Sequence, residues 1–532
     1  MPELNPFTHQ AGGPLELGGA LHQLGQQLVT AGRLDEARQS LELSLDLLPG
    51  QAGCHFDLAN VLYADGRLDD AIAEYRQAVR LDPRLASAWY NLGVALMQSE
   101  RVPDAEHAYR RALRYSPNHP ETHNNLAILL QSTGRGNEAI QHYRGAAALR
   151  PGYDEPRFNL GSLLHDLGRL DEARVVFEEL LAECPEHTEA SNNLANVLTE
   201  MGSHAEARAR FEAVLHVNPA HNLSRWNLGL NQLRTGDWAV GWKNYEARLR
   251  GARSDRPLWD GRELNGARIV LMAEQGMGDL LQMARFVRAV AERGGRIILE
   301  CHPPLTELFS RIPEVERVVE VGMDLPEHDC WLPMMSLPGL LGVTLETLPA
   351  EVPYLVADAA RVEYWRQKLS AWQGLRVGFA WSGNPKFRVN AKRSLTAGDV
   401  RNISKFARQS TGTPVHLFSL QKGVPAPTGA RLTPLDDDAS SMDDLAAVMM
   451  NLDLVLTVDT SVAHLAGALG RPVWTMLAFH ADWRWMTGAG TPWYPTMRLF
   501  RQARQGDWSN VLDEVESELG VMRCESRSQS VV

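Results

Sequence analysis

Three short segments of this 532-residue chain combine glycines, acids, hydroxyls and cations, and each directly follows an apolar run typical of a β-strand. The first segment is EQGMGD (274–279), which follows ARIVLMA (267–273). Gly276 and Gly278 allow the backbone to turn tightly beside a ligand. Asp279, at the start of the next helix, either caps that helix or faces a cleft. Ligands of open α/β sheets bind at such strand-to-helix turns, so the segment is a candidate binding site.

The second segment, VDTSVAHLA (458–466), lies where a strand is expected to end and a helix to begin. Free backbone N–H groups, the hydroxyls of Thr460 and Ser461 and the helix dipole favour binding of a phosphate group there. Asp459 and His464 complete this candidate diphosphate site. The alternative is that Asp459 and Thr460 only cap the helix and that His464 is a residue of the core or of the helix surface.

The third segment, WSGNPKF (381–387), continues into Asn390, Lys392, Arg393 and Ser394. It brings four cations within eight residues, from Lys386 to Arg393, to the end of another expected strand. In a chain with a net charge of −12, cations that face a cleft suit an anionic ligand. A solvated basic loop is the alternative.

The elements that position these segments follow from the pattern after Arg250, where short apolar runs alternate with helical stretches, as in a parallel α/β sheet. The apolar runs are 267–273, 296–301 and 318–321 in a first block and 375–381, 415–420, 452–459 and 472–477 in a second. We expect helices at 279–293, 305–310, 361–372 and 508–519, the last packing back across the first block. The pattern predicts a connector (251–265), two α/β lobes (266–358 and 359–520) and a flexible tail (521–532).

The chain before Arg250 repeats with a period of 34 residues, because six prolines recur at that spacing: Pro49, Pro83, Pro117, Pro151, Pro185 and Pro219. With each proline at position 32, repeats begin at residues 18, 52, 86, 120, 154 and 188, position 20 is always Ala and position 8 is always Gly or Ala. This pattern is typical of tetratricopeptide helix pairs, in which small residues permit close packing and proline ends the second helix. We predict an α-solenoid over 18–250, after an N-terminal extension (1–17), with a degenerate seventh repeat from Asn222 as its cap.

Position 6 of the repeats carries Asn in five consecutive units: Asn91, Asn125, Asn159, Asn193 and Asn227. We call this set the Asn column. Stacked helix pairs form a concave face that usually binds another polypeptide, and position 6 is expected to point into it. Carboxamides offer both donors and an acceptor, so a column of them can bind an extended chain through its peptide groups. The alternative is that Asn is simply common at this position of such repeats.

Composition limits the function classes. An apolar fraction of 44% and a charged fraction of 22% indicate a folded globular protein, and the net charge of −12 disfavours a nucleic-acid partner. Five scattered cysteines lack the spacing of a zinc site or a disulfide framework, and we interpret Asp436–Asp438 as a solvated loop rather than a metal site. No signal peptide and no transmembrane stretch is predicted, so we expect a cytoplasmic protein.

The motifs in 266–519 resemble those of the heptosyltransferase-like branch of the GT-B glycosyltransferases, which have two Rossmann-like lobes facing a cleft. The resemblance implies that Asp279 is the catalytic base and that Asp459 to Ala466 lies at the nucleotide phosphates of the donor. Lys386 best matches the family's cationic phosphate contact, with Arg393 nearby. The chain departs from the family pattern by carrying Ser461-Val462-Ala463 in place of a Gly-Pro-containing stretch.

The whole layout is similar to bacterial flagellin glycosyltransferases and, more distantly, to O-GlcNAc transferase, in which repeats deliver a protein acceptor. The resemblance implies a protein O-glycosyltransferase that uses a nucleotide-activated sugar as co-substrate, with no metal ion and no other cofactor. It implies an acceptor protein in the repeat groove, with flagellin as one candidate, and a chain that can form homo-oligomers. A transferase for a cell-envelope glycolipid and a non-catalytic scaffold remain alternatives, and the donor is either a nucleoside diphosphate sugar or a CMP-linked acid.

Overall fold

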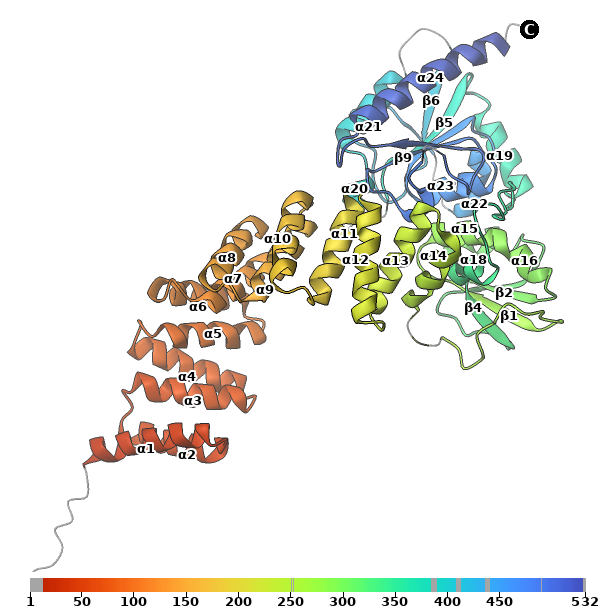
Figure 1. Ribbon diagram of the computed structural model, residues 1–532. Coiled ribbons are helices and arrows are strands. Elements are labelled where there is room, and N and C mark those ends of the chain that lie inside the picture. Colours follow the sequence, from red (N-terminus) through yellow and green to blue (C-terminus); the bar gives the residue numbers. More distant parts are fainter. Residues whose placement is uncertain are drawn as a thin grey trace, which may run out of the picture. The chain divides into compact units, whose positions relative to one another are not determined.

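A computed structural model describes residues 13–249, 251, 253–383, 390–407, 413–435, 441–488 and 490–529 (Figure 1). The chain divides into two compact units, Met1–Val197 and Leu198–Val532. Within the described ranges no helix has an apolar stretch long enough to cross a membrane.

The first unit is a stack of antiparallel helix pairs, which confirms the predicted solenoid. Its helices are α1 (Pro14–Thr30) and α2 (Leu34–Leu47), α3 (Ala52–Ala64) and α4 (Leu68–Leu81), α5 (Ala86–Gln98) and α6 (Val102–Tyr115), α7 (Pro120–Ser132) and α8 (Gly136–Leu149), and α9 (Asp154–Asp166) and α10 (Leu170–Glu183). The next helix, α11 (Thr188–Glu200), contains the division between the units. Helices α3, α5, α7, α9 and α11 begin at the predicted repeat starts, whereas α1 begins at Pro14, four residues before the predicted start at residue 18.

Small side chains let the two helices of each repeat approach. The position-20 alanines Ala37, Ala71, Ala105, Ala139, Ala173 and Ala207 are all fully buried. At position 8, a Cβ on Gly93 would lie 2.5 Å from Tyr109 Cε1, and one on Gly161 would lie 2.7 Å from Phe177 Cε1. In the third and fifth repeats the ring at position 24 therefore occupies the space of a position-8 Cβ, whereas the second, fourth and sixth repeats accommodate Ala there.

A second feature, found in the second to fifth and the seventh repeats, is a hydrogen bond from the side chain at position 4 to the carbonyl of the preceding proline. His55 Nε2 lies 3.1 Å from the Pro49 carbonyl oxygen, and Trp89 Nε1 donates to the Pro83 carbonyl at 2.9 Å. His123, Arg157 and Arg225 make the same contact to Pro117, Pro151 and Pro219. Carbonyls at helix ends need such partners, so different residue types at position 4 perform one capping task.

The second unit begins with the end of the repeats, α12 (His204–Val217), α13 (Asn222–Thr235), α14 (Trp238–Tyr245) and the 3₁₀ turn η1 (Glu246–Arg248). Loss of the period predicted a boundary near residue 250, but the seventh repeat is part of the same compact unit as the α/β lobes. The reason is aromatic packing. Trp238 stacks on Trp493 at 5.2 Å between ring centroids, and the ring of Trp242 meets that of Trp483 edge-on at 5.3 Å.

Two parallel sheets follow, which confirms the predicted α/β region with two lobes. The first has the order β3 (Val315–Glu320), β2 (Arg296–Cys301), β1 (Arg268–Met272), β4 (Cys330–Pro333). The second has the order β10 (Met497–Arg501), β9 (Val473–Leu477), β8 (Leu454–Val458), β5 (Leu375–Ala380), β6 (Val415–Ser419), β7 (Thr433–Pro434). Strands β4, β7 and β10 were not predicted, because CWLP and TP are short and MRLFR is interrupted by charges.

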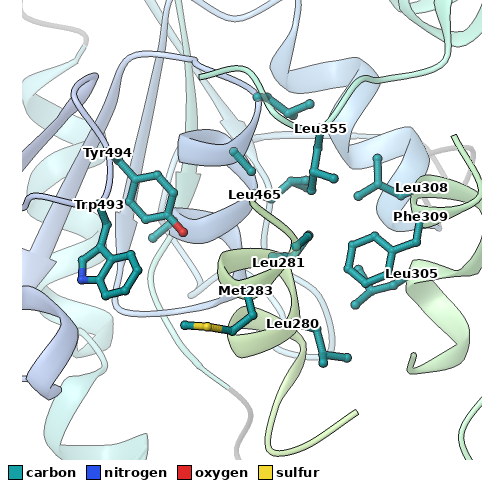
Figure 2. Close-up of a cluster of buried hydrophobic side chains, with 14 of the residues drawn as sticks. Leu280, Leu281, Met283, Leu305, Leu308, Phe309, Leu355, Leu465, Trp493 and Tyr494 are labelled. Carbon is teal, nitrogen blue, oxygen red and sulfur yellow. The ribbon is translucent and has the colours of Figure 1, made fainter. Parts of the chain in front are cut away.

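The lobes meet where α15 (Met277–Met283) packs against α23 (Ser461–Ala468). Figure 2 shows Leu280, Leu281 and Met283 of α15 in one apolar cluster with Leu465 of α23, and all four side chains are fully buried. Consequently the helices that begin with the first and second motif segments are held in direct contact.

Two expectations about helices are wrong. The expected helix 279–293 is divided into α15, η2 (Ala284–Phe286) and α16 (Val287–Ala291). The last helix, α24 (Ser509–Gln529), continues through most of the expected flexible tail. Its residues Val511 and Val515, with Trp508 just before the helix, are buried against the second sheet instead of the first lobe. Its apolar spacing predicts a buried face but does not say which sheet covers that face.

The remaining helices cover the sheets. They are η3 (Pro303–Leu305), α17 (Thr306–Phe309), η4 (Met334–Ser336) and α18 (Leu337–Leu340) in the first lobe, and α19 (Ala359–Leu369), α20 (Asn390–Arg393), α21 (Ala397–Phe406), α22 (Met442–Met449) and η6 (Trp483–Trp485) in the second. Asp358 caps α19 by accepting a hydrogen bond from the Arg361 N–H at 2.8 Å, and α19 packs on α22.

Candidate functional site

The glycine-rich turn of the first lobe lies against the start of α23 in the second lobe. A Cβ on Gly278 would lie 2.8 Å from His464 Cδ2 and 3.5 Å from Ser461 Cα. The missing side chain of Gly278 therefore permits the close approach of two segments that are more than 180 residues apart in the chain. The structure brings together the first two of the three predicted segments.

Asp279 makes two kinds of contact. Its Oδ2 accepts a hydrogen bond from the Gly276 N–H at 2.7 Å, which caps α15, and its Oδ1 accepts one from Arg484 of η6. The side chain retains 18% exposure. Each carboxylate oxygen has two acceptor sites, so Asp279 caps its helix and still has lone pairs that can face a ligand.

Arg484 donates hydrogen bonds to several polar side chains around Asp279. Its side chain is only 6% exposed, and besides Asp279 it donates to Gln282 Oε1 at 2.7 Å and to Asp482 Oδ1 at 2.7 Å. Asp482 is 39% exposed. A buried guanidinium needs such partners for its N–H groups and charge, and Arg484 thereby joins a residue of each lobe.

His464 lies inside the packing between the lobes. It is 5% exposed, its ring stacks on Trp485 at 5.0 Å, and its Nδ1 shares a hydrogen bond of 2.9 Å with the Tyr494 hydroxyl. Burial, followed by the positive charge of Arg484, lowers the pKa of His464 to about 3. The imidazole is neutral at physiological pH and brings no positive charge to a phosphate; a contact between His464 and the donor stays a prediction.

Asp459 and Thr460 follow β8. Burial and the neighbouring Asp482 carboxylate raise the pKa of Asp459, while Arg393 and Arg484 act in the opposite direction. The Thr460 hydroxyl accepts a hydrogen bond from the Val462 N–H at 3.2 Å and so caps α23. A carboxylate held in a disfavoured charge state is characteristic of functional sites.

The third segment is only partly described, because Lys386 and its neighbours from 384 to 389 lie outside the described residues, as does 436–440 with Asp436–Asp438. Arg393 is described and lies close to the end of β5, where a Cβ on Gly383 would be 2.9 Å from its Nη2. Arg393 Nε is buried and has no hydrogen-bond partner in the described part of the chain. Over the same residues, no three His, Cys, Asp or Glu side chains gather in an arrangement that could hold a metal ion.

The Asn column contacts neighbouring repeats in the first unit. Asn91 and Asn193 donate from Nδ2 to Asn60 Oδ1 at 2.8 Å and to Ser162 Oγ at 3.3 Å, each one repeat earlier. Asn125 and Asn159 donate in the same direction, to the Tyr90 hydroxyl and to Asn124 Oδ1. One amide hydrogen of each of these four residues is thus used between repeats, and Asn193 Oδ1 also accepts a hydrogen bond from Asn192 Nδ2 at 3.3 Å.

Sequence reasoning missed Arg484, Asp482 and Gln282. The segment Trp483-Arg484-Trp485 follows β9, and a cation between two tryptophans just after a strand was the available indication. The rule that ligands bind beyond the carboxyl ends of parallel strands would have included it.

Comparisons with known proteins match both parts of the chain. Residues 8–225 match the family model for the cilia and flagella-associated protein 70 C-terminal domain, and residues 439–507 match glycosyltransferase family 9 (heptosyltransferase). The second match includes β8, α23 and η6, which carry the second-lobe part of the candidate site, but not the glycine-rich turn or Asp279. Protein FlbA of Caulobacter vibrioides is 26% identical over 335 residues, which are 54% of this chain and 53% of FlbA. The chain therefore spans about half the length of this curated relative.

Solved structures of repeat proteins are also similar. YrrB, described as a TPR protein with an unusual peptide-binding site, is 24% identical over 35% of this chain and 95% of its own, with a TM-score of 0.33. PilF of Pseudomonas aeruginosa is 19% identical over 40% of this chain and 97% of its own, with a TM-score of 0.34. The observed helix pairs and the two parallel sheets thus describe a tetratricopeptide-like solenoid followed by an α/β region, and residues 439–507 of that region are similar to glycosyltransferase family 9 (heptosyltransferase).

Proposed function

We propose that this protein is an O-glycosyltransferase with a GT-B arrangement of its two lobes, which transfers a sugar from a nucleotide-activated donor to Ser or Thr of a protein in the cytoplasm. The observation that carries the proposal is the contact of Gly278 with Ser461 and His464, because it brings the candidate base and the candidate phosphate site together. The match of residues 439–507 to glycosyltransferase family 9 supports the reaction class.

In the proposed reaction the hydroxyl oxygen of the acceptor bonds to the anomeric carbon of the sugar, and the bond from that carbon to the donor phosphate breaks. The electron pair of that bond leaves with the phosphate, and the hydroxyl proton passes to Asp279. General-base assistance of this kind contributes about 10²- to 10⁴-fold.

The negative charge of the leaving phosphate is stabilised by Arg393, by the N–H groups at the start of α23 and, as the sequence predicts, by Lys386. Glycine at 276 and 278 leaves room for the donor beside the turn. Arg393, Lys386 and the N–H groups at the start of α23 supply positive charge at fixed positions. The proposed scheme therefore uses no divalent cation and no other cofactor.

The repeats are proposed to hold the acceptor in an extended conformation. The carboxamides of the Asn column offer both donors and an acceptor, which suits the peptide groups of such a chain without selecting its side chains. The resemblance of the whole layout to flagellin glycosyltransferases makes flagellin the first acceptor to test.

The test is intact-mass spectrometry of secreted and flagellar proteins from cells with and without this protein. We expect one protein to lose a defined sugar mass in the deleted strain. If all protein masses are unchanged while a cell-envelope glycolipid loses a sugar, the acceptor is a lipid. If neither changes and no nucleotide raises the melting temperature of the purified protein, the chain is a non-catalytic scaffold.

A further inference from the structure

The tyrosine at position 24 has one role inside the repeat array and a different one at its end. In the second and fourth repeats this residue donates within its own repeat, Tyr75 to Asn60 Oδ1 at 2.7 Å and Tyr143 to Gln131 Oε1 at 2.8 Å. In the seventh repeat the equivalent residue, Tyr245, accepts a hydrogen bond from Gln275 Nε2 at 2.7 Å. Gln275 belongs to the glycine-rich turn that leads to Asp279.

The partner of Tyr245 is the strained residue of that turn. Gln275 has a φ of +61°, a left-handed conformation that residues with a Cβ adopt only at an energetic cost. Such a conformation persists when surrounding contacts hold it. The Tyr245 hydroxyl is one such contact, and the Gln275 carbonyl supplies a second, since it lies 3.0 Å from His302 Nε2.

Arg248 is a second residue of the seventh repeat that contacts the glycine-rich turn. Its side chain is 4% exposed, its guanidinium lies 4.5 Å from the centre of the Tyr245 ring, and its Nη2 donates to Glu274 Oε2 at 2.7 Å. Burial raises the pKa of Tyr245 to about 12, so its hydroxyl is neutral at physiological pH. The last repeat therefore contacts two consecutive residues of the turn through buried polar groups, in addition to the aromatic packing of its helices.

We infer that Tyr245 is a positioning residue for the proposed transfer reaction: through Gln275 it fixes the glycine-rich turn and, with it, the carboxylate of Asp279. The inference rests on the proposed function for its effect on turnover. The effect on the turn itself is independent of that function. The degenerate seventh repeat thus contacts the glycine-rich turn through a tyrosine at a position where regular repeats also carry one.

The test compares Tyr245→Phe with Tyr143→Phe in the full chain. Each change removes one buried hydroxyl at the same repeat position, but only the first contacts the turn. We expect Tyr245→Phe to accelerate hydrogen exchange in residues 274–279 and to lower kcat about 3- to 10-fold, the range expected for one lost hydrogen bond. The fraction of donor sugar that is hydrolysed should rise, because a mobile Asp279 carboxylate accepts a proton from water as well as from the acceptor hydroxyl. Tyr143→Phe should leave all three quantities at their wild-type values.

Two outcomes overturn the inference. One is unchanged exchange in residues 274–279 of Tyr245→Phe. The other is faster exchange with unchanged kcat and unchanged donor hydrolysis in an active enzyme. If the unmodified protein transfers no sugar at all, the proposed function fails, and the exchange rates alone then decide whether Tyr245 holds the turn.

Discussion

Arg484 of the second lobe donates a hydrogen bond to the carboxylate of Asp279 in the first lobe, across 205 positions of sequence. The contact joins the candidate base to η6, and Gln282 and Asp482 accept further hydrogen bonds from the same guanidinium. The lobes are thus connected at the candidate site by one buried cation as well as by the apolar packing of α15 on α23.

Asp279→Asn should remain folded, because the amide oxygen can still accept the hydrogen bond of the Gly276 N–H. Sugar transfer should fall about 10²- to 10⁴-fold, the usual contribution of a general base. Asp482→Asn is the matched control, since Asp482 also pairs with Arg484 but does not cap α15. A loss of turnover confined to Asp482→Asn would assign the base to Asp482 instead.

Arg484→Met should destabilise the second unit by about 3–5 kcal/mol, because it leaves the carboxylates of Asp279 and Asp482 without their cation. Urea unfolding followed by tryptophan fluorescence measures this unit, since every tryptophan except Trp89 lies in it. In combination with Asp279→Asn the total loss should be at least about 1 kcal/mol smaller than the sum of the single losses. Additive losses would contradict a direct interaction.

His464 should make the second unit less stable in acid. Its pKa is lowered to about 3 in the folded chain, whereas an unfolded histidine titrates near 6.5. Between these values only the unfolded state binds the proton, so stability falls as the pH decreases, by about 2 kcal/mol from pH 7 to pH 5. Melting temperatures at pH 5, 6 and 7 should therefore show a steeper slope for the unmodified chain than for His464→Asn, and equal slopes would refute the assignment.

Gly278→Ala should destabilise the protein by about 1–3 kcal/mol, because the new methyl group would meet His464 Cδ2 at 2.8 Å. Helix propensity alone would give the opposite sign, since Ala is favoured over Gly by about 1 kcal/mol inside a helix. At Gly276 the nearest atom to a new Cβ is Asp279 Oδ2 at 3.3 Å, so Gly276→Ala should cost less than about 1 kcal/mol. A gain in stability for Gly278→Ala would show that the two motif segments are not in contact.

Replacement of Asn125, Asn159 and Asn193 together by Ala should weaken acceptor binding about tenfold or more, given about 0.5–1.5 kcal/mol for each hydrogen bond. Because Asn193 also donates to Ser162, the control is Ser162→Ala, which removes that contact between repeats and keeps the amide. Fluorescence anisotropy with a labelled acceptor peptide provides the dissociation constants. Wild-type affinity of the triple variant would assign the Asn column to the repeat consensus.

The fold was largely predictable because its signals are periodic. Prolines at a fixed spacing end each helix pair, and apolar runs between helical stretches indicate parallel strands. Strand β10 was missed because Arg498 and Arg501 interrupt its apolar pattern, although Phe500 packs on Trp474 of the adjacent strand. Such an edge strand obtains its stability from a neighbour that the local sequence does not specify.

The candidate site was predictable only in part, because some of its residues are brought together by tertiary contacts that no local motif specifies. The glycine-rich turn and the start of α23 have local motifs, and the structure places them in contact. The partner of Asp279 could not be deduced, since nothing near Arg484 in the sequence specifies which acid it meets. The side of the sheets on which α24 packs was missed for the same reason: an amphipathic helix defines its own buried face but not its partner.

The equal register of helices α3 to α10 has a consequence for how such chains change over generations. In the second to fifth repeats the helices begin at the same positions of each 34-residue unit, and the position-4 side chain contacts the proline of the repeat before it. Duplication or loss of one unit by recombination would therefore join chemically equivalent ends. The number of repeats could change in single genetic events, while the seventh repeat, whose Tyr245 and Arg248 contact the glycine-rich turn, would be retained as a unit with the lobes.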